Sequence, residues 1–299
     1  MSEGLKQIGQ RSQEIGFVEV EHPFIETARM FAANYAAVVG LIVLVIIIVV
    51  SLLGPLIYTT DPWEMVWSPF SPPGAKGFLL GTDYLGRDLV AQIIHGGRAT
   101  ILVGCAAALL SVFIGITFGA LSGYYRGWVE EVLMRITEFF QVLPTLLFSM
   151  VLVALFGASL AMITFAIGIV SWTGVARITR AEFLKIRELE YVTAARSSGA
   201  NNANLIFRVI LPNSLPPIVV QAALLIGFAI LFEAGLSFLG LSDANVMSWG
   251  AIMGNNRPYI LLHGFTIMYP GLAIFLTVLS ISLIGDGLND ALNPKLRKR

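Results

Sequence analysis

Long stretches without a charged residue dominate this sequence of 299 residues. The first stretch, Ala36–Ile57, has Ser51 as its only clearly polar side chain. A helix of this length can cross the hydrocarbon core of a bilayer, which is about 30 Å thick. Similar stretches follow at residues 99–123, 139–158, 159–176, 214–241 (where Glu233 interrupts) and 264–285. We therefore predict an all-α integral membrane protein with six transmembrane helices.

The composition excludes several classes of function. Apolar residues make up 56% of the chain and charged residues only 13%, far below the charged fraction of soluble proteins. The net charge is zero, so nucleic acid is not an expected partner. No Gly-Lys pair forms a phosphate-binding Walker loop, and the three histidines lack metal-ligand spacing. We expect no catalytic residue, no metal and no cofactor on this chain, so its energy must come from a partner or a gradient.

The apolar stretches also predict how the chain is divided. We expect an N-terminal tail at 1–34 with an interfacial helix at Pro23–Ala33, transmembrane helix 1 at 35–58, a loop at 59–98, a transmembrane core at 99–290 and a C-terminal tail at 291–299. Placing the N-terminus in the cytoplasm puts most basic residues on that side. Both tails are then cytoplasmic, and the loop at 59–98 is extracytoplasmic.

Small residues and prolines predict local features of the spans. Gly115, Gly119 and Gly123 recur at every fourth position and permit a close helix crossing. This crossing is either internal to the chain, which we favour, or a contact with another chain. Pro144 and Pro270 are expected to kink their helices, and a tight hairpin near residues 157–159 is expected to join the third and fourth spans.

A polar segment at residues 188–213, which we call the elbow, separates the fourth and fifth spans. Good helix formers end at Gly199, which tolerates positive φ. Asn201 or Asn202 can cap a second short helix, which is expected to end before Pro212. Such an elbow suits docking into a groove on another protein. The alternative is an ordinary amphipathic connector.

The elbow resembles the EAA loop of ABC-importer permeases. The resemblance rests on the order Ala-Ala, Gly, Leu-Pro, although Thr193 stands where the general pattern has Glu and Val209 where it has Ile. An acid placed further upstream is typical of the peptide/nickel branch of this family. The resemblance implies coupling helices that dock on a cytoplasmic ATPase through Glu190, Ala194, Ala195, Gly199, Leu211 and Pro212.

A second resemblance lies in the loop before the second span, at residues 80–88. The segment Leu-Gly-Thr-Asp-Tyr-Leu-Gly-Arg-Asp is similar to a segment of the C-type permeases in the peptide/nickel family. It either carries a specific extracytoplasmic role or forms a structural clamp between Arg87 and the aspartates Asp83 and Asp88. We favour the clamp, because arginine and carboxylate groups form strong charge-assisted hydrogen bonds.

Glu233 is an acidic residue inside an apolar span, where charge is costly and indicates either function or a partner. It is expected either to pair with Arg98 or Arg257, or to line a translocation path or gate together with Trp249. Residues 247–253, which include Trp249, are predicted to form an external half-helix. Two further segments, 232–241 and 285–294, also resemble the family. The second is predicted to terminate the last helix, with Asp286 and Asp290 capping or clamping the cytoplasmic tail.

Four resemblances in family order identify a C-type permease subunit of a peptide/nickel-class ABC importer. This implies a MetI-like ABC-importer permease fold in the cytoplasmic membrane and alternating access. The implied partners are a homologous second permease subunit, two cytoplasmic ATPase subunits that hold ATP and Mg²⁺, an extracytoplasmic solute-binding protein and membrane lipid. The chain itself is then not an enzyme. Peptides are the expected cargo, with nickel or another small solute as the alternative. Two other classes remain open: an ion-coupled secondary transporter, and a membrane scaffold or receptor subunit.

Overall fold

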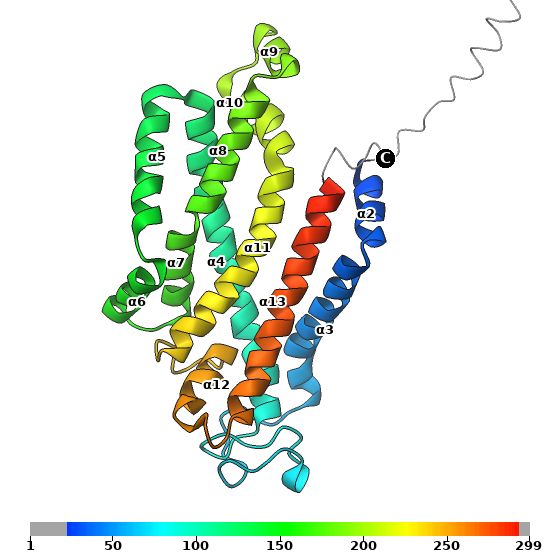
Figure 1. Cartoon of the computed structure of the whole chain (residues 1–299), viewed down its shortest axis with the longest axis vertical. Coiled ribbons are helices and arrows are strands. Elements are labelled where there is room, and N and C mark those ends of the chain that lie inside the picture. The colour runs from blue at the N-terminus through cyan, green and yellow to red at the C-terminus, as the bar shows by residue number, and fades with distance from the viewer. Residues whose placement is uncertain (1–22, 293–299) are drawn as a thin grey trace, which may run out of the picture.

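The computed structural model describes residues 23–292, so most of the two expected tails lies outside the described residues. Figure 1 shows a bundle of long helices. In chain order the helices are α2 (Pro23–Ala33), α3 (Tyr35–Ile57), η1 (Ala75–Gly77), α4 (Leu89–Tyr125), α5 (Gly127–Val142), α6 (Thr145–Phe156), α7 (Leu160–Ser171), α8 (Thr173–Arg187), α9 (Glu190–Ser197), α10 (Asn202–Asn204), η2 (Leu205–Ile210), α11 (Leu211–Phe238), α12 (Trp249–Asn256), η3 (Arg257–Tyr259) and α13 (Phe265–Leu292). The prediction of an all-α fold is confirmed.

Four of these helical segments are long and apolar enough to cross a membrane singly: α3, α4, the continuous segment Asn202–Phe238, and α13. Two bent pairs, α5 with α6 and α7 with α8, pass the same test together. If each pair is one span, residues 23–292 contain six spans, as predicted. The second span begins earlier than expected, because Asp88 caps α4 by accepting a hydrogen bond from the amide of Val90.

The third span, expected over residues 139–158 with a kink at Pro144, is broken into two helices. Its two helices, α5 and α6, meet at an angle of 85°. The break lies at Leu143, which is extended (φ −64°, ψ 133°), and at Pro144. Proline disfavours the helical conformation of the residue before it and donates no amide hydrogen bond, so the helix stops there. The kink predicted at Pro144 is therefore a full interruption.

The predicted hairpin between the third and fourth spans is confirmed. Gly157 has a φ of +92°, which favours glycine, and turns the chain directly after α6. Ser159 then caps α7, since its side chain accepts a hydrogen bond of 3.1 Å from the amide of Met162. The chain continues through α7 and, after a bend of 41°, through α8.

The glycine ladder packs α4 against α8 within this chain. A Cβ added to Gly119 would lie 2.4 Å from the carbonyl oxygen of Ala176. A Cβ added to Gly115 would lie 2.5 Å from the Cβ of Val175, and one added to Gly123 would lie 2.6 Å from the Cβ of Phe183. No side chain larger than hydrogen fits at these positions. The internal crossing predicted from the sequence is confirmed.

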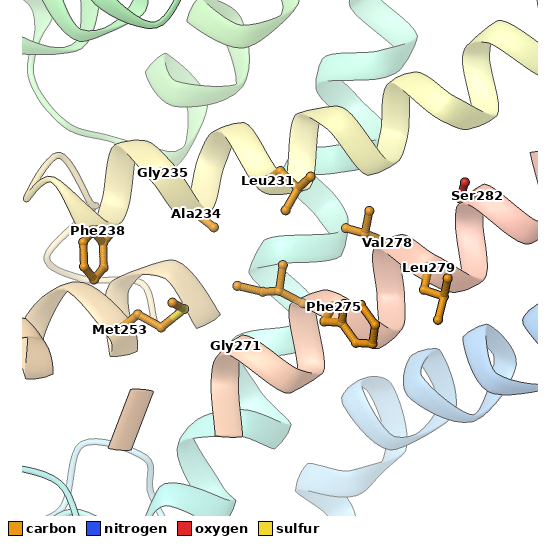
Figure 2. A pocket seen from close by; sticks show the side chains of 11 residues that line it. Leu231, Ala234, Gly235, Phe238, Met253, Gly271, Phe275, Val278, Leu279 and Ser282 are labelled. Atoms are coloured by element: carbon orange, nitrogen blue, oxygen red, sulfur yellow. The ribbon is translucent and has the colours of Figure 1, made fainter. Parts of the chain in front are cut away.

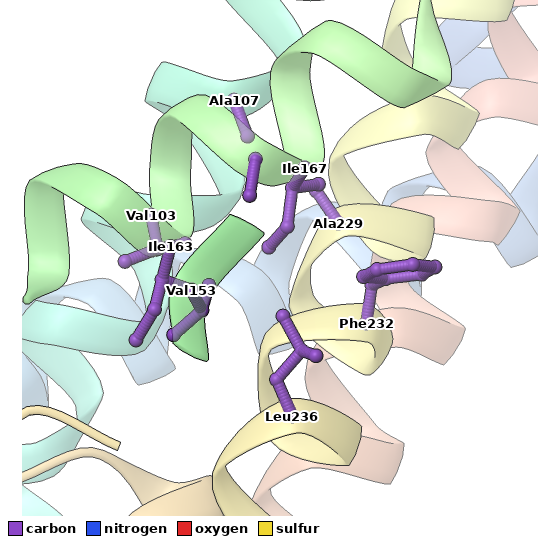
Figure 3. Packing of buried hydrophobic residues seen from close by; sticks show 9 residues of the cluster. Val103, Ala107, Val153, Ile163, Ile167, Ala229, Phe232 and Leu236 are labelled. Atoms are coloured by element: carbon purple, nitrogen blue, oxygen red, sulfur yellow. The ribbon is translucent and has the colours of Figure 1, made fainter. Parts of the chain in front are cut away.

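A buried apolar cluster joins four spans around the middle of α4. It contains side chains from α4, α6, α7 and α11, and Figure 3 shows how they converge. The members are Val103, Ala107, Val153, Ile163, Ala166, Ile167, Ala229, Phe232 and Leu236. Because the cluster includes α6 and α7, the bent pairs are part of the core.

The last helix reaches into the segment 285–294 that was predicted to terminate it. α13 runs to Leu292, so Gly285 and Asp286 lie inside the helix. Gly287 gives room for Ala37 of α3, because a Cβ added to Gly287 would lie 2.3 Å from the Cβ of Ala37. Asp290 accepts a hydrogen bond of 3.2 Å from the side-chain amide of Asn34. The start of α3 and the end of α13 are thus fastened together.

The elongated molecule has two distinct ends. Figure 1 places α2, the end of α13 and α9 at one end. The loop that follows α3, together with α12, lies at the opposite end.

Candidate functional site

The elbow projects beyond the spans as α9 and α10, at the extreme end of the molecule in Figure 1. Its turn is closed by two hydrogen bonds. The amide of Gly199 donates to the carbonyl of Arg196 at 3.0 Å, and the amide of Ala200 donates to the carbonyl of Ala195 at 3.1 Å. With Gly199 at a φ of +88°, this is a Schellman motif. The predicted break at Gly199 is confirmed.

A second cap restarts the helix after this turn. The side chain of Asn201 accepts a hydrogen bond of 2.8 Å from the amide of Asn204, so Asn201 is the N-cap of α10. The side chain of Asn202 is used differently, since its oxygen accepts a hydrogen bond of 2.8 Å from the hydroxyl of Tyr124 in α4. The two asparagines therefore fix both the shape of the elbow and its attachment to the bundle.

Apolar side chains anchor the elbow from below. Val192 of α9 is fully buried, as is Leu205 of η2. Both belong to a cluster that includes Tyr124 of α4 and Phe183 of α8. Val192 was not singled out in the sequence, although it lies on the face of α9 opposite the exposed Ala194. This cluster makes the elbow continuous with the transmembrane core.

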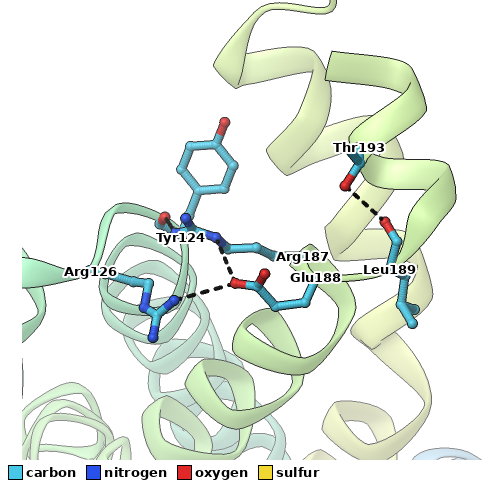
Figure 4. A network of polar contacts seen from close by, with 6 residues as sticks. All are labelled: Tyr124, Arg126, Arg187, Glu188, Leu189 and Thr193. Atoms are coloured by element: carbon cyan, nitrogen blue, oxygen red, sulfur yellow. Dashed lines mark hydrogen bonds and ion pairs between the residues drawn. The ribbon is translucent and has the colours of Figure 1, made fainter. Parts of the chain in front are cut away.

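A polar network also ties the start of the elbow to the ends of α4 and α8 (Figure 4). Glu188 accepts from Arg126 at 3.3 Å and lies 3.6 Å from the guanidinium of Arg187. Arg187 also donates to the backbone carbonyl of Tyr124. This network was not predicted from the sequence. Its signal was the presence of opposite charges, Arg126 and Glu188, in the two polar segments that follow α4 and α8.

The residues implicated by the EAA resemblance form the outer surface of the elbow. Glu190, Ala194, Gly199 and Pro212 are exposed, and Ala195 and Leu211 are half-buried. Exposed apolar side chains accompany them, with Tyr191 46% exposed and Phe207 66% exposed. A projecting, partly apolar surface of this kind can fit into a groove.

The second helix of the elbow does not end before Pro212. α10 passes through a π-helical turn, η2, directly into α11, and the helical segment runs without a break from Asn202 to Phe238. Pro212 directly follows this π-helical turn, so the continuous helix passes through Pro212 with one backbone hydrogen bond missing. The elbow is therefore rigidly joined to the fifth span.

Glu233 pairs with neither of the arginines expected for it. It is 1% exposed, and its Oε1 accepts hydrogen bonds from Ser237 at 2.7 Å and from Ser248 at 2.8 Å. Arg98 donates instead to backbone carbonyls at the end of α3, and Arg257 to the carbonyl of Phe238. Because Ser248 also caps α12, Glu233 joins the fifth span to that short helix.

Trp249 lies at the start of α12, the short helix predicted over residues 247–253. It is 2% exposed, and its indole N–H donates to the carbonyl of Ile93 in α4 at 2.8 Å. Its backbone amide donates to the hydroxyl of Thr100 at 3.1 Å. Trp249 therefore fixes α12 against α4.

The aspartates of the 80–88 segment form a clamp, but not with Arg87. Asp83 is 1% exposed and accepts from the amides of Leu85 and Arg87 and, at 2.9 Å, from the side chain of Gln92. The guanidinium of Arg87 lies over the ring of Trp63, 5.2 Å from its centroid. Within residues 23–292 no ion pair joins Arg87 to an aspartate, because backbone amides already satisfy Asp83.

Tyr58 completes the clamp from the end of α3. Its hydroxyl donates to the carboxylate of Asp88, which is fully buried. Burial, and then the hydrogen bond to Asp88, raise the pKa of Tyr58 from 10.0 to about 12. The phenol is therefore neutral and able to donate at physiological pH. No sequence signal marked Tyr58 beyond its place at the end of an apolar stretch.

Two family models match separate parts of the chain. The model described as "Binding-protein-dependent transport system inner membrane component" matches residues 115–298. A second, described as "N-terminal TM domain of oligopeptide transport permease C", matches residues 22–73. The first alone covers more than half of the chain and includes the elbow, α11, α12 and α13.

Curated relatives extend this likeness over nearly their full lengths. A di/tripeptide transport system permease protein DppC of Pseudomonas aeruginosa is 39% identical, covering 92% of this chain and 93% of that one. The oligopeptide transport system permease protein OppC of Haemophilus influenzae is 36% identical, covering 98% of this chain and 95% of that one. A glutathione transport system permease protein GsiD of Pectobacterium atrosepticum is 35% identical, covering 93% of this chain and 93% of that one.

A solved structure supports the fold. The methionine ABC transporter MetNI in an inward-facing conformation contains a chain that aligns with a TM-score of 0.57, covering 68% of this chain and 96% of that chain. At 18% identity this likeness concerns the fold alone. From the matched families and relatives, this chain belongs to the family of inner membrane components of binding-protein-dependent transport systems, the permease subunits of ABC importers.

Proposed function

We propose that this chain is one of two transmembrane subunits of an ATP-driven importer of short peptides, and that its elbow receives the movement of a partner ATPase. The observation that carries the proposal is the elbow itself. An exposed surface of small and apolar residues is mounted on a buried anchor and fastened to α4, α8 and α11. A family of ABC-importer permeases supplies the class of partner.

Peptides are the proposed cargo because relatives similar to this chain carry di/tripeptide, oligopeptide and glutathione transport in their names. The wider assembly of this family includes a second permease, ATPase subunits and a solute-binding protein. We propose two ATPases, with ATP and Mg²⁺ held by them, and a homologous second permease. The chain is a permease subunit, and ATP hydrolysis belongs to separate subunits.

The proposed orientation places the elbow end in the cytoplasm. The basic residues Arg126, Arg177, Arg180, Lys185, Arg187 and Arg208 surround the elbow or lead into it. The end of α13 and the helix α2 lie at the same end, so both tails are proposed to be cytoplasmic. The clamp of Asp83, Asp88 and Tyr58 then lies on the extracytoplasmic side, together with Arg87.

We propose that α11 transmits movement for alternating access, because it is joined rigidly to the elbow at one end and contacts α12 near the other. A push on α9 is passed to α11 without an intervening loop, because η2 and α11 are continuous. At the far end of α11, Glu233 holds α12 through Ser248. We propose that movement of α11 shifts α12 and Trp249 as one unit at the outer opening, which gives these residues a gating role.

The alternatives have less support. For nickel, residues 23–292 contain no group of three or more His, Cys, Asp or Glu side chains that could hold a metal ion. For an ion-coupled transporter, Glu233 would need a charged intramembrane partner, whereas its partners are two serine hydroxyls. A scaffold without transport is disfavoured by the named transport systems among the relatives.

The proposal is tested with the purified complex in proteoliposomes. We expect uptake of a dipeptide that requires ATP and the binding protein and is insensitive to an uncoupler. Ala194→Arg, which places a long charged side chain on the exposed face of α9, should abolish uptake. Ala32→Arg is the matched control, since Ala32 is an exposed alanine of α2 at the same end of the molecule. Uptake that persists without ATP but stops with an uncoupler would overturn the proposal.

A further inference from the structure

Two cavities follow one another along the same side of α11. The first, of about 230 Å³, lies between α8, the start of α11 and the end of α13. The second, of about 320 Å³, lies further along α11 and is bounded by α6, α7 and the start of α8. They occupy residues 213–220 and 221–228 of α11 in turn. We call these two cavities together the α8–α11 groove.

The inner part of the groove carries polar groups in the middle of apolar spans. Gln221 contributes its side-chain amide, flanked by the hydroxyl-bearing residues Ser171 and Thr173. Within residues 23–292 the side chain of Gln221 has no hydrogen-bond partner, and the buried hydroxyl oxygen of Ser171 also has none. A Cβ added to Gly174 would lie 3.6 Å from the amide nitrogen of Gln221, so that amide lies beside bare backbone.

Polar groups left unpaired in this way are unfavourable against lipid. An amide inside hydrocarbon loses its hydrogen bonds to water without replacement, so polar side chains in spans usually face a protein partner or an aqueous path. Gln221 is half-buried rather than enclosed, so a ligand can reach it. The inner part of the groove therefore offers hydrogen bonds to something that this chain alone does not supply.

The end of the groove nearest the elbow offers charges of both signs. Glu182 and Lys185 lie there 3.3 Å apart, together with the amide side chain of Asn289. Pro216 and Pro217 also line this cavity. Neither proline has an amide hydrogen, so the helix carbonyls four residues earlier lose their usual donors and remain available as acceptors. Both donors and acceptors of hydrogen bonds are present.

A third cavity provides a contrast. It has a volume of about 630 Å³ and lies between α11, α12 and α13, as Figure 2 shows. Phe238, Met253 and Phe275 are among its lining residues, and Ser282 is the only hydroxyl. This larger cavity offers almost no hydrogen bonds, so it does not match a zwitterionic cargo.

We propose that the α8–α11 groove is this chain's part of the cargo path and a binding site for the main chain of a short peptide. Gln221 contacts a peptide amide group, while Glu182 and Lys185 at the elbow end attract the ammonium and carboxylate termini. Charge complementarity favours this occupant, because a zwitterion with an amide between its charges needs the groups that line the groove. This inference rests on the proposed function and names the residues that meet the cargo.

The first test uses the fact that Cys105 is the only cysteine of the chain. In a Cys105→Ala background, Gln221→Cys and, as control, Thr117→Cys are introduced one at a time. Thr117 is an exposed polar residue of the α4 span whose hydroxyl bonds only its own helix. Labelling by a maleimide is followed in the assembled complex with and without alanyl-alanine, using inside-out vesicles and mass spectrometry of this chain.

We expect alanyl-alanine to slow labelling of Gln221→Cys about fivefold and to leave Thr117→Cys unchanged; alanine alone should have little effect. Three outcomes would overturn the inference. Gln221→Cys could be labelled at the same rate with and without the dipeptide. Both positions could be slowed equally. Finally, Gln221→Cys could be labelled in the isolated chain but not in the complex, which would show that the second permease covers the groove.

The second test measures transport by Gln221→Met, which keeps the length of the side chain but removes its amide. Uptake of alanyl-alanine should fall about fivefold, the effect of one lost neutral hydrogen bond, while the ATPases still co-purify. Thr117→Val should transport normally. Normal uptake by Gln221→Met would overturn the proposed role of the α8–α11 groove in peptide binding and leave the proposed function intact. Absence of ATP-driven uptake in the unaltered complex would instead overturn the proposed function.

Discussion

The backbone amide of Ala200 donates a hydrogen bond of 3.1 Å to the carbonyl of Ala195, across the left-handed residue Gly199. This bond closes the turn between α9 and α10 and sets the angle at which α9 leaves the bundle. No atom lies within 4 Å of a Cβ added to Gly199, so glycine is needed here for its backbone conformation and not for space.

Replacing Gly199 with alanine should disturb the elbow without a steric clash. An alanine at positive φ costs about 1 kcal/mol, which should lower the thermal stability of the elbow and reduce peptide-stimulated ATPase activity of the complex several-fold. Gly235→Ala is the control, because Gly235 lies in α11 with no atom within 4 Å of an added Cβ. Gly199→Asn should retain most activity, since asparagine tolerates the left-handed region. Equal activity of Gly199→Ala and Gly235→Ala would refute this account.

Much of this elbow could be predicted from the sequence, because its signals are local. Gly199 marks a positive φ and Asn201 marks a cap, and each acts on residues within one helical turn. The apolar spans were predictable for the same reason, since membrane crossing depends on continuous composition. The close crossing of α4 with another helix could also be predicted, because the spacing of Gly115, Gly119 and Gly123 places them on one helix face.

The remaining features depend on tertiary packing that local patterns do not contain. Pro212 was expected to stop a helix, yet the continuous helix passes through it directly after the π-helical turn. Glu233 was expected to meet an arginine, but the fold brings Ser248 to it from a different element. The same holds for Arg87, because the amides of its own turn occupy Asp83 first.

The glycine ladder should be intolerant of added volume. In Gly119→Val the new Cβ would lie 2.4 Å from the carbonyl oxygen of Ala176, so α4 and α8 must separate. We expect a loss of about 1–3 kcal/mol of stability, measured as a lower melting temperature of the detergent-solubilised chain. Gly235→Val, which meets no neighbour, should melt much closer to the unaltered protein. Equal melting of the two variants would contradict the packing described.

Ser248 should control the mobility of α12. Ser248→Ala removes both the hydrogen bond to Glu233 and the cap on the amide of Ala251, at a cost of about 1–2 kcal/mol. We expect faster amide hydrogen exchange across α12, read by mass spectrometry. Ser280→Ala is the control, since the buried Ser280 hydroxyl bonds only the carbonyl of Leu276 in its own helix. Unchanged exchange in Ser248→Ala would show that Glu233 does not hold α12.

The Tyr58 hydrogen bond predicts a dependence of stability on alkaline pH. The pKa of Tyr58 is raised from 10.0 to about 12, so the folded state favours the neutral phenol. Its contribution is complete below pH 10 and is lost as the pH rises through 12. Tyr58→Phe should therefore lower the melting temperature at pH 8, by an amount corresponding to about 1 kcal/mol. The difference from the unaltered chain should shrink between pH 10 and 12, and a constant difference would argue against the assigned donor.

Docking of α9 on the ATPase can be measured by co-purification from native membranes. The unaltered chain, Ala194→Arg and Ala32→Arg are each used as bait, and the recovered ATPase is quantified by mass spectrometry. We expect the second permease with all three baits, and ATPase with the unaltered chain and Ala32→Arg but not with Ala194→Arg. Full recovery of ATPase with Ala194→Arg would contradict docking through the exposed face of α9.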